Sequence, residues 1–376
     1  MTDRVTMREM TNKPVLHNVR ILDFTWVLAG PYASRLLADF GAEVIKVQPL
    51  VSTEDDDAFS RGYYNTWNRN KLGITLNLNM PEGIALVKKL VSISDAVMEN
   101  FTPHVMSNWG LDYPELKKIR PDIIMVSMSV MGRQSYYNGY GPTVHALSGM
   151  TGLMSLNGRP VGPGFSYADL VAGLYASLSL LEALEHRRRR GRGRHIDLSE
   201  VDIMKEVLKE KEPPLAVNSV YRCKDEDRWC AITVDTEGAW RGLKRAMGNP
   251  AWAEDSEFAT PDERISHKEE LDRLMGAWAG ERTTEELLSL LRQNGVAAGI
   301  IQDAADLACD PQLKERGFYA SSGGTPFTDA SPVRMGDIEM EYREAPFPGR
   351  DNAYVYGELL GLSKKEIEDL KTKGVI

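Results

Sequence analysis

The residues that decide the fold are 19–47, VRILDFTWVLAGPYASRLLADFGAEVIKV. Residues 19–24 have the composition of a buried strand, and residues 33–40 show the apolar spacing of a helix that stops at Gly41. Residues 43–47 are a second apolar run, typical of a strand. A strand, a helix and a strand joined this closely predict a βαβ unit, whose short connection requires a parallel pair of strands.

The same alternation continues along the chain. Residues 81–93 predict a helix that begins at a proline, and residues 96–99 predict a strand. Residues 114–119 predict a short helix before a strand of β-branched and methionine residues at 123–129. Strands that alternate with helices predict an α/β fold, in which a mostly parallel sheet carries helices on both faces.

The longest predicted helix covers residues 168–189. Its apolar residues recur at helical spacing and predict one buried stripe of Leu170, Val171, Leu174, Tyr175, Leu178, Leu181 and Leu184. Arginines in its last turn complement the negative end of the helix dipole, and Gly191 and Gly193 stop the helix. The most apolar part, residues 170–184, contains Glu182 and is too short to span a bilayer.

The composition and the secondary-structure pattern of the sequence change near residue 205 and again near residue 325. Residues 205–219 are charged and contain two successive prolines, which suits a linker. Residues 220–325 combine charged helical sequence with strand patterns at 220–223, 229–234 and 298–302. Residues 326–376 are irregular until a capped helix at 363–371. The sequence therefore predicts a first domain at 1–204, a linker, a smaller α+β domain and a C-terminal segment.

Composition and missing motifs exclude several classes of protein. A net charge of −9 opposes nucleic-acid binding, and three cysteines cannot form a disulfide framework. Residues 1–14 lack the apolar core of a signal peptide, so we expect a cytoplasmic protein that does not bind a membrane. The sequence has no Gly-x-Gly-x-x-Gly after the first strand, no Walker loop and no His-Glu-x-x-His or paired Cys-x-x-Cys. We therefore expect no nicotinamide, flavin or metal cofactor.

Asp169 lies in GPGFSYADLVAG, residues 162–173, where a glycine-rich turn leads into the long helix. A carboxylate in the first turn faces the positive end of the helix dipole, which favours its ionised form and its use as a nucleophile. The pattern from Ser166 to Asp169 also fits a capping box, in which the acid only stabilises the helix. On local sequence the cap is favoured. His145 lies in an apolar run and is interpreted as a core residue, and the arginine-rich residues 186–195 as a solvated helix end.

Several segments together resemble the class III, or CaiB/BaiF-type, coenzyme A transferases. They are, in chain order, DFTWVLAGP at 23–31, NRNK at 68–71, ITL at 74–76, ENFTP at 99–103, GPGFSYADLVAG at 162–173, residues 186–197 and ELLGLS at 358–363. Each motif alone is weak, but their order and spacing cover nearly the whole chain. The resemblance implies a large Rossmann-like domain built from both chain ends, so that residues 326–376 return to it, with a smaller domain inserted. It also implies an interlocked homodimer.

The function implied by the resemblance is that of an acyl-CoA:carboxylate CoA-transferase, with an acyl-CoA donor and a carboxylic acid acceptor as its substrates. Asp169 stands where the family's catalytic aspartate stands, which forms a mixed anhydride and then an aspartyl-CoA thioester. The nucleophile is then favoured over the cap. The positions that match the family's CoA site are Leu28, Ala29, Leu76, Asn77, Leu78, Asn79, Asn100, Phe101, Thr102 and Tyr140.

The sequence departs from the family, and two alternatives stay open. Asn108 and Pro49 stand where basic residues can bind CoA phosphates, so Arg69, Lys71 or the arginines at 187–194 are candidates to replace them. These losses and a short stretch after Asp197 suit a CoA-binding subunit of a heteromeric transferase. An α-methylacyl-CoA racemase needs two bases. Tyr140 stands where the racemases have a histidine and His145 is displaced from that position, which favours the transferase.

Overall fold

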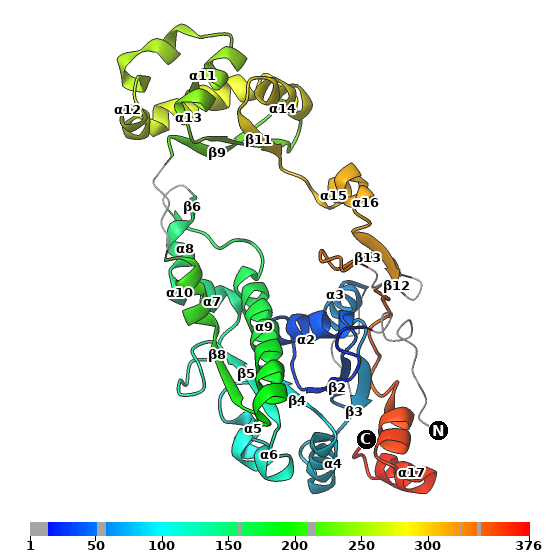
Figure 1. The fold of residues 1–376 in the computed structure, drawn as a ribbon. Helices are drawn as coiled ribbons and strands as arrows, with labels where there is room; N and C mark the ends of the chain where they lie inside the picture. Colours follow the sequence, from blue (N-terminus) through cyan, green and yellow to red (C-terminus); the bar gives the residue numbers. More distant parts are fainter. Residues whose placement is uncertain (1–13, 51–57, 157–158, 210–214, 323–324, 337–339) are drawn as a thin grey trace. The chain divides into compact units, whose positions relative to one another are not determined.

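The computed structural model of this chain describes residues 14–50, 58–156, 159–209, 215–322, 325–336 and 340–376 (Figure 1). Contacts within the chain divide it into two compact units. The larger unit runs up to Lys209 and resumes at Gly317, so both ends of the chain contribute to it. The smaller unit is formed by the intervening residues.

A six-stranded sheet forms the centre of the larger unit. Its strands are β1 (Arg20–Asp23), β2 (Glu43–Gln48), β3 (Leu72–Thr75), β4 (Ala96–Glu99), β5 (Ile124–Ser129) and β8 (His195–Ser199). They lie in the order β3-β2-β1-β4-β5-β8, and every neighbouring pair is parallel, which confirms the predicted sheet. The strand order reverses between β1 and β4. Open α/β sheets bind ligands at the carboxyl ends of their strands at such a point.

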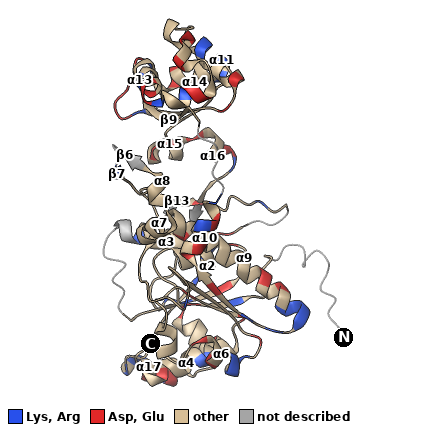
Figure 2. Cartoon of the chain, turned by 90° about the vertical axis from the view of Figure 1, so that its left-hand side faces the viewer, with Lys and Arg blue, Asp and Glu red and all other residues tan. Residues whose placement is uncertain are grey.

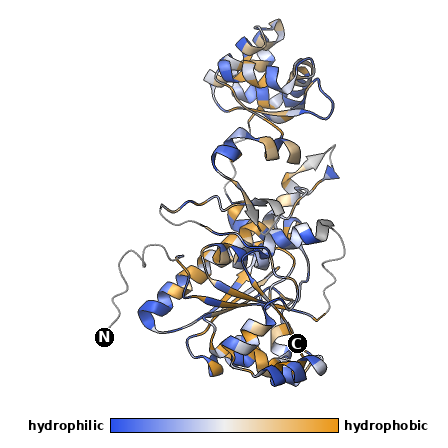
Figure 3. Cartoon of the chain, turned by 90° about the vertical axis from the view of Figure 1, so that its right-hand side faces the viewer, coloured by the Kyte–Doolittle hydropathy of each residue, from blue (hydrophilic) through white to orange (hydrophobic). Residues whose placement is uncertain are grey.

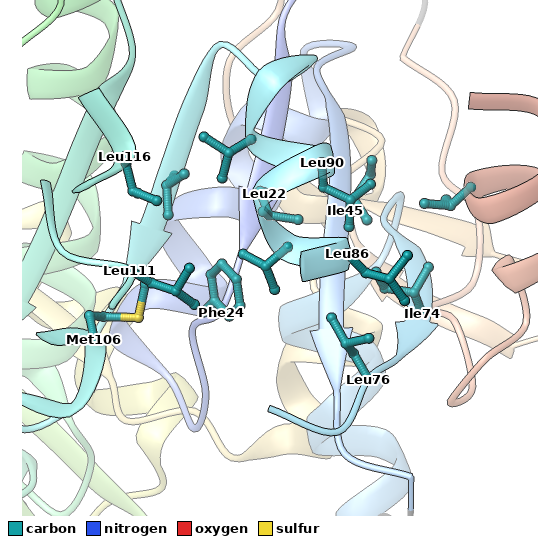
Figure 4. Packing of buried hydrophobic residues seen from close by; sticks show 14 of the residues in the cluster. Leu22, Phe24, Ile45, Ile74, Leu76, Leu86, Leu90, Met106, Leu111 and Leu116 are labelled. Atoms are coloured by element: carbon teal, nitrogen blue, oxygen red, sulfur yellow. The ribbon is translucent and has the colours of Figure 1, made fainter. Parts of the chain in front are cut away.

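Helices cover both faces of this sheet. One face packs against α4 (Pro81–Ser92), α5 (Val105–Asn108) and α6 (Tyr113–Ile119), and the other against α2 (Ala29–Asp39) and α9 (Tyr167–Arg190). Successive strand residues point to opposite faces, so Leu22 packs with Leu90 of α4 (Figure 4), whereas Ile21 packs on the side of α2. The central strands are buried on both faces and are largely hydrophobic (Figure 3).

The larger unit contains further helices and short strands. They are α3 (Ala58–Asn68), α7 (Gly141–Ser148), α8 (Met150–Leu153), β6 (Ser155–Leu156), β7 (Arg159–Pro160), α10 (Glu200–Val207), β12 (Tyr319–Ser322), β13 (Thr325–Asp329), η3 (Ala353–Leu359) and α17 (Lys364–Thr372).

The sequence patterns miss strands β3 and β8. Both are edge strands of the sheet. β3 contains Gly73, and β8 contains His195 and Asp197 and is not fully buried at any position. An edge strand packs against fewer neighbours, so its sequence needs less apolar character than the central strands.

The buried face of α9 is the opposite of the predicted one. Its buried residues are mostly small: Ala168, Asp169, Ala172, Gly173, Ala176, Ser177, Leu180 and Ala183. The expected stripe is largely exposed, with 50% of Leu174 and 66% of Leu178 accessible. A Cβ on Gly173 would lie 2.8 Å from the Ala29 carbonyl, so only small residues let α9 pack this closely on α2.

The two ends of α9 agree with the sequence. The helix ends at Gly191, whose φ of +66° is the left-handed conformation that glycine adopts readily, and its last turn is positively charged (Figure 2). Its 24 residues are, contrary to expectation, long and apolar enough to cross a membrane. Core helices pass the same test, and α9 packs against α2 and β5.

The smaller unit has an antiparallel sheet in the order β11-β10-β9 and a set of helices. Its elements are β9 (Val217–Arg222), β10 (Trp229–Val234), α11 (Glu237–Ala246), η1 (Ala251–Glu254), η2 (Ser256–Phe258), α12 (Pro261–Ser266), α13 (Lys268–Ala279), α14 (Thr284–Gln293), β11 (Ala297–Ile300), α15 (Ala304–Cys309) and α16 (Pro311–Glu315). Part of the expected linker at 205–219 belongs to α10 and β9. The charged Lys205 and Glu206, which suggested a linker, lie on the exposed face of α10.

A buried ion pair ties the C-terminal segment to α2. The guanidinium of Arg69 is fully buried and binds Asp39 of α2 at 2.7 Å and Asp329 of β13 at 2.9 Å. Its face also lies 4.6 Å from the centre of the Tyr342 ring. Arg69 therefore joins segments that are far apart in the sequence.

We predict that Arg69→Met lowers the free energy of unfolding by about 3 kcal/mol, because the buried Asp39 loses its short ion pair and keeps only Arg35 at 3.9 Å and the Asn70 amide. Urea denaturation measures the change. The control is Arg188→Met, which breaks an exposed pair with Glu185 and should change little. Equal midpoints for both variants would contradict this role for Arg69.

Candidate active site

A cleft opens at the carboxyl ends of the strands, where the strand order reverses. Its walls come from the loops after β1, β4 and β5, from residues before α7, and from the first turns of α9 and α10. The volume of the cleft is about 690 Å³, which includes space open to solvent. The residues that line it are 26–29, 100–103, 128–130, 137–140, Asp169 and Glu200.

Asp169 lies in the first turn of α9 and lines this cleft, with only 8% of the residue exposed. Ser166 is the N-cap residue of α9, but its side chain makes no bond to the helix backbone. The Ser166 side chain is instead hydrogen-bonded to the Asp169 carboxyl. The capping-box interpretation is therefore wrong, and Asp169 is free of the role that the local sequence favoured.

The start of α7 packs against this carboxyl. A Cβ on Gly141, the first residue of α7, would lie 2.8 Å from Ser166 Oγ and 3.2 Å from Asp169 Oδ2. His145 of the same helix is buried, and its Nε2 accepts the Ala168 N–H at 3.1 Å. A ring nitrogen that accepts this bond is unprotonated, and burial lowers the pKa of His145. His145 is thus a core residue, as interpreted from the sequence, and it fixes the first turn of α9.

A second buried carboxyl lies beside Asp169. It belongs to Glu200, the first residue of α10, which directly follows β8 and is 7% exposed. The two side chains are hydrogen-bonded to each other, and both line the cleft. A hydrogen bond between two carboxyl groups requires a proton on one of them.

Burial decides the charge of this pair. It raises the pKa of Asp169 to about 6, against the lowering effect of the bonds with Ser166 and Glu200. Burial, together with the charge of Asp169 and the bond to it, raises the pKa of Glu200 to about 8. At neutral pH Asp169 is the ionised partner and Glu200 the protonated one. The sequence predicts that the helix dipole favours the ionised form of Asp169, but burial shifts its pKa in the opposite direction.

A second cleft adjoins the first, and Phe101 lines both. It encloses about 910 Å³, open solvent included. The structure places the residues matched to the CoA site in these two clefts: Leu28, Ala29, Asn100, Phe101, Thr102 and Tyr140 in the first, and Leu76, Asn77, Leu78, Asn79 and Phe101 in the second. Side chains from distant parts of the sequence are thus brought together at one edge of the sheet.

The side chain of Asn100 holds the loop after β1. Its Oδ1 accepts the Trp26 N–H at 2.9 Å, and its Nδ2 donates to the Trp26 carbonyl at 3.0 Å. The next residue, Val27, has a φ of +62°, a left-handed backbone that is strained for a β-branched side chain. Asn100 therefore shapes the wall of the cleft through the backbone.

Aromatic rings line the boundary between the clefts. The ring of Trp26 lies 6.4 Å from that of Tyr140 and 6.5 Å from that of Phe101. Phe101 in turn lies 5.5 Å from Trp109, which lines the second cleft. Trp26 and Tyr140 are exposed, and Phe101 and Trp109 are half-buried, so these rings suit the apolar and aromatic parts of an extended ligand.

The basic residues considered for CoA phosphates lie elsewhere. Arg69 and Lys71 are buried in ion pairs, and Arg187 is bonded to Asp95, so compensation by these three is wrong. In the described part of the chain, neither cleft is lined by Lys or Arg. Among the same residues, no group of three His, Cys, Asp or Glu is placed to hold a metal ion.

Sequence reasoning misses two residues of the cleft. Interpreting residues 186–195 as a solvated helix end hides β8, and with it Glu200 at the end of that strand. Ser129 ends β5 and lines the cleft with a buried hydroxyl that has no hydrogen-bond partner among the described residues. Polar residues at the carboxyl ends of predicted parallel strands are the signal that would find both.

Comparisons with known proteins identify the family. The model of CoA-transferase family III matches residues 16–352. The chain is 31% identical to a succinate–glutarate CoA-transferase of Agrobacterium fabrum, over 94% of this chain and 98% of that protein. It is 29% identical to the beta subunit of a succinyl-CoA–L-malate CoA-transferase of Chloroflexus aurantiacus, over 96% of this chain and 98% of that protein. The structure of a CaiB/BaiF family protein from Brucella suis matches with a TM-score of 0.83 and 28% identity, over 93% of this chain and 100% of that one. The chain therefore belongs to CoA-transferase family III, the class III CoA-transferases.

Proposed function

We propose that this class III CoA-transferase moves CoA between two carboxylic acids through covalent intermediates on Asp169. The observation that carries the proposal is a buried carboxylate, ionised at neutral pH, in the cleft at the switch point of the sheet. A positioned, ionised carboxylate is a usable nucleophile. The loss of the capping role leaves this carboxyl available to react.

The proposed reaction has two mirrored halves. Asp169 attacks the thioester carbonyl of the donor acyl-CoA, CoA leaves, and a mixed anhydride forms. CoA then attacks the aspartyl carbonyl of the anhydride, which releases the donor acid and leaves an aspartyl-CoA thioester. The acceptor carboxylate attacks this thioester, and the same steps in reverse give the acceptor's CoA thioester and free Asp169. The thioester is conserved throughout, so no nucleotide is consumed.

The two clefts suggest how an acyl-CoA would lie. The thioester must reach Asp169 in the first cleft, and the aromatic boundary around Phe101 leads to the second, wider cleft for the rest of the CoA. The Ser129 hydroxyl in the first cleft is a donor for the developing oxyanion. Succinyl-CoA is the first donor to test, because the names of both cited relatives include succinate or its thioester.

Exchange of the α-proton of an acyl-CoA, the chemistry of a racemase, is the second candidate. Glu200 beside Asp169 supplies the second acid–base group that Tyr140 and His145 do not. Because the two carboxyls are bonded to each other, they lie on one side of a substrate, whereas inversion needs groups on both sides. The transferase therefore remains the better supported function.

We also propose that a second copy of this chain covers the exposed face of α9. Leu174, Leu178 and Leu181 are each at least 40% exposed there, beside Tyr175. An apolar strip of this kind on a helix marks an interaction surface. In a homodimer each copy would cover the strip of the other. In a heteromer a related subunit would cover the strip of this chain.

We predict that succinyl-CoA converts the wild-type chain to a covalent adduct at Asp169, seen by intact mass and peptide mapping. Asp169→Asn should form no adduct and should exchange CoA more slowly by about 10³-fold or more. Exchange by Asp169→Asn at the wild-type rate would contradict the proposal. Solvent deuterium at the α-carbon of a chiral 2-methylacyl-CoA, without an acceptor acid, would favour the racemase instead.

Gly141→Ala tests the space beside the nucleophile. The added methyl group would lie 2.8 Å from Ser166 Oγ and 3.2 Å from Asp169 Oδ2, so it must displace the carboxyl or its Ser166 partner, and adduct formation should slow by about 10–100-fold. Gly152→Ala is the matched control, because its Cβ would meet nothing within 4 Å. Equal rates for the two variants would contradict the need for a precisely positioned Asp169 carboxyl.

The assembly is tested by light scattering. We expect a dimeric mass for the wild-type chain and a monomeric mass for Leu178→Lys, which places a charge on the exposed strip of α9. Lys88→Glu, on α4 at the other face of the sheet, should leave the dimer intact. A monomeric wild-type chain, or a Leu178→Lys dimer of unchanged stability, would contradict this surface.

A further inference from the structure

We propose that Glu200 is a second catalytic residue, which protonates the departing CoA sulfur and takes the proton back when CoA attacks the anhydride. The inference rests on the proposed reaction at Asp169 and adds the proton that the reaction moves. Among the described residues, the carboxyl of Asp169 is hydrogen-bonded to the side chains of Glu200 and of Ser166, which lies in the N-cap position of α9.

The position of Glu200 is fixed by the fold. Ser199 caps α10 by accepting the Asp202 N–H at 3.2 Å, so the helix does not need Glu200 as its cap. The Glu200 side chain turns instead into the cleft, where it is buried and meets Asp169. In the attack the donor carbonyl carbon bonds to Asp169, and the sulfur is one bond further away. A carboxyl in contact with Asp169 is therefore within reach of that sulfur.

The charge of Asp169 makes the acidity of Glu200 depend on the reaction. While Asp169 is ionised, its charge and its hydrogen bond add to burial and hold the proton on Glu200. Acylation converts Asp169 to a neutral anhydride and removes that negative charge. Glu200 then becomes a stronger acid at the moment when the thiolate leaves and can accept a proton.

The proton balance closes over the two steps. The bond from Asp169 oxygen to the acyl carbon forms, the carbon–sulfur bond breaks, and the Glu200 proton moves to sulfur, leaving Glu200 ionised. In the next step Glu200 takes this proton back while sulfur bonds to the aspartyl carbon and the donor acid leaves as a carboxylate. The pair and the CoA sulfur together carry one negative charge before and after the first step, which limits the cost of burying anions.

Other titratable groups near α10 are already engaged. The helix packs against α7, α9 and β8. His145 of α7 accepts the Ala168 N–H, His195 of β8 is bonded to Ser127, and Asp197 of β8 accepts the Arg133 N–H. On α10 itself, Asp202 and Lys205 are exposed. Asp169 is the group whose charge acts on Glu200.

The first test is a titration that needs no substrate. The side-chain carboxyls of glutamate are labelled with ¹³C, and the Glu200 signal is assigned by its loss in Glu200→Gln. We expect this signal to titrate well above the usual glutamate range in the wild type and at lower pH in Asp169→Asn, which imitates the uncharged acylated state. A Glu200 signal with an ordinary pKa, or one unmoved by Asp169→Asn, would overturn the inference.

The second test follows adduct formation in a single turnover with succinyl-CoA from pH 6 to 9. Glu200→Gln keeps the size and an N–H donor to Asp169 but has no acidic proton. We expect its rate to fall by about 10²-fold, with the loss of the decline that the wild type shows as Glu200 ionises at high pH. Glu206→Gln, exposed on the same helix, should behave as the wild type.

The outcomes separate the two proposals. No adduct in the wild type would overturn the function proposed for Asp169, while the titration would still measure the charge of Glu200. A wild-type adduct with a Glu200→Gln rate and pH profile equal to wild type would overturn the role of Glu200 alone. A slower Glu200→Gln that keeps the high-pH decline would show that Glu200 only positions Asp169.

Discussion

The close packing of α9 on α2 is the constraint on which the site depends. Small residues along α9 let the two helices meet at backbone distance, so that a Cβ on Gly173 would lie 2.8 Å from the Ala29 carbonyl. Ala29 begins α2 and lines the cleft, and Asp169 lies one helical turn before Gly173. A bulky side chain in this contact would push α9 away from the sheet and carry Asp169 out of the cleft.

The burial of two carboxyl groups in the cleft then determines which of them is ionised. Two carboxyl groups are buried together without a Lys or Arg lining the described cleft, and they lower the cost by sharing a proton. This arrangement leaves Asp169 ionised and able to react, while its neighbour is protonated. Substrate contacts in the two clefts come from aromatic rings, polar side chains and backbone, as in many pockets for extended ligands.

The central fold could be predicted because its strands and helices bury continuous apolar runs. The βαβ unit at residues 19–47 and the alternation after it gave a parallel sheet, and the order of motifs gave the family. The edge strands β3 and β8 could not be recognised, because edge strands need few apolar residues. The buried face of α9 was misjudged because its small residues carry little hydrophobic signal, although they pack most closely.

The candidate site, too, could be predicted from the sequence only in part. Asp169 and the loops around it follow from sequence motifs, but the partner of Asp169 does not. Glu200 is separated from it by thirty-one positions, and only the tertiary packing of α10 on α9 brings their carboxyls together. The local pattern at Ser166 favoured a cap, whereas in the structure that side chain binds the Asp169 carboxyl. Side-chain direction at a helix start depends on what the rest of the chain places beside it.

The most direct test of covalent catalysis at Asp169 follows an oxygen atom. An acceptor acid whose carboxylate is labelled with ¹⁸O is turned over with succinyl-CoA, and the peptide that contains Asp169 is weighed by mass spectrometry. In the proposed reaction the bridging oxygen of the second anhydride comes from the acceptor and stays on Asp169, so this peptide should gain ¹⁸O. Complete CoA transfer with no ¹⁸O at Asp169 would contradict the account.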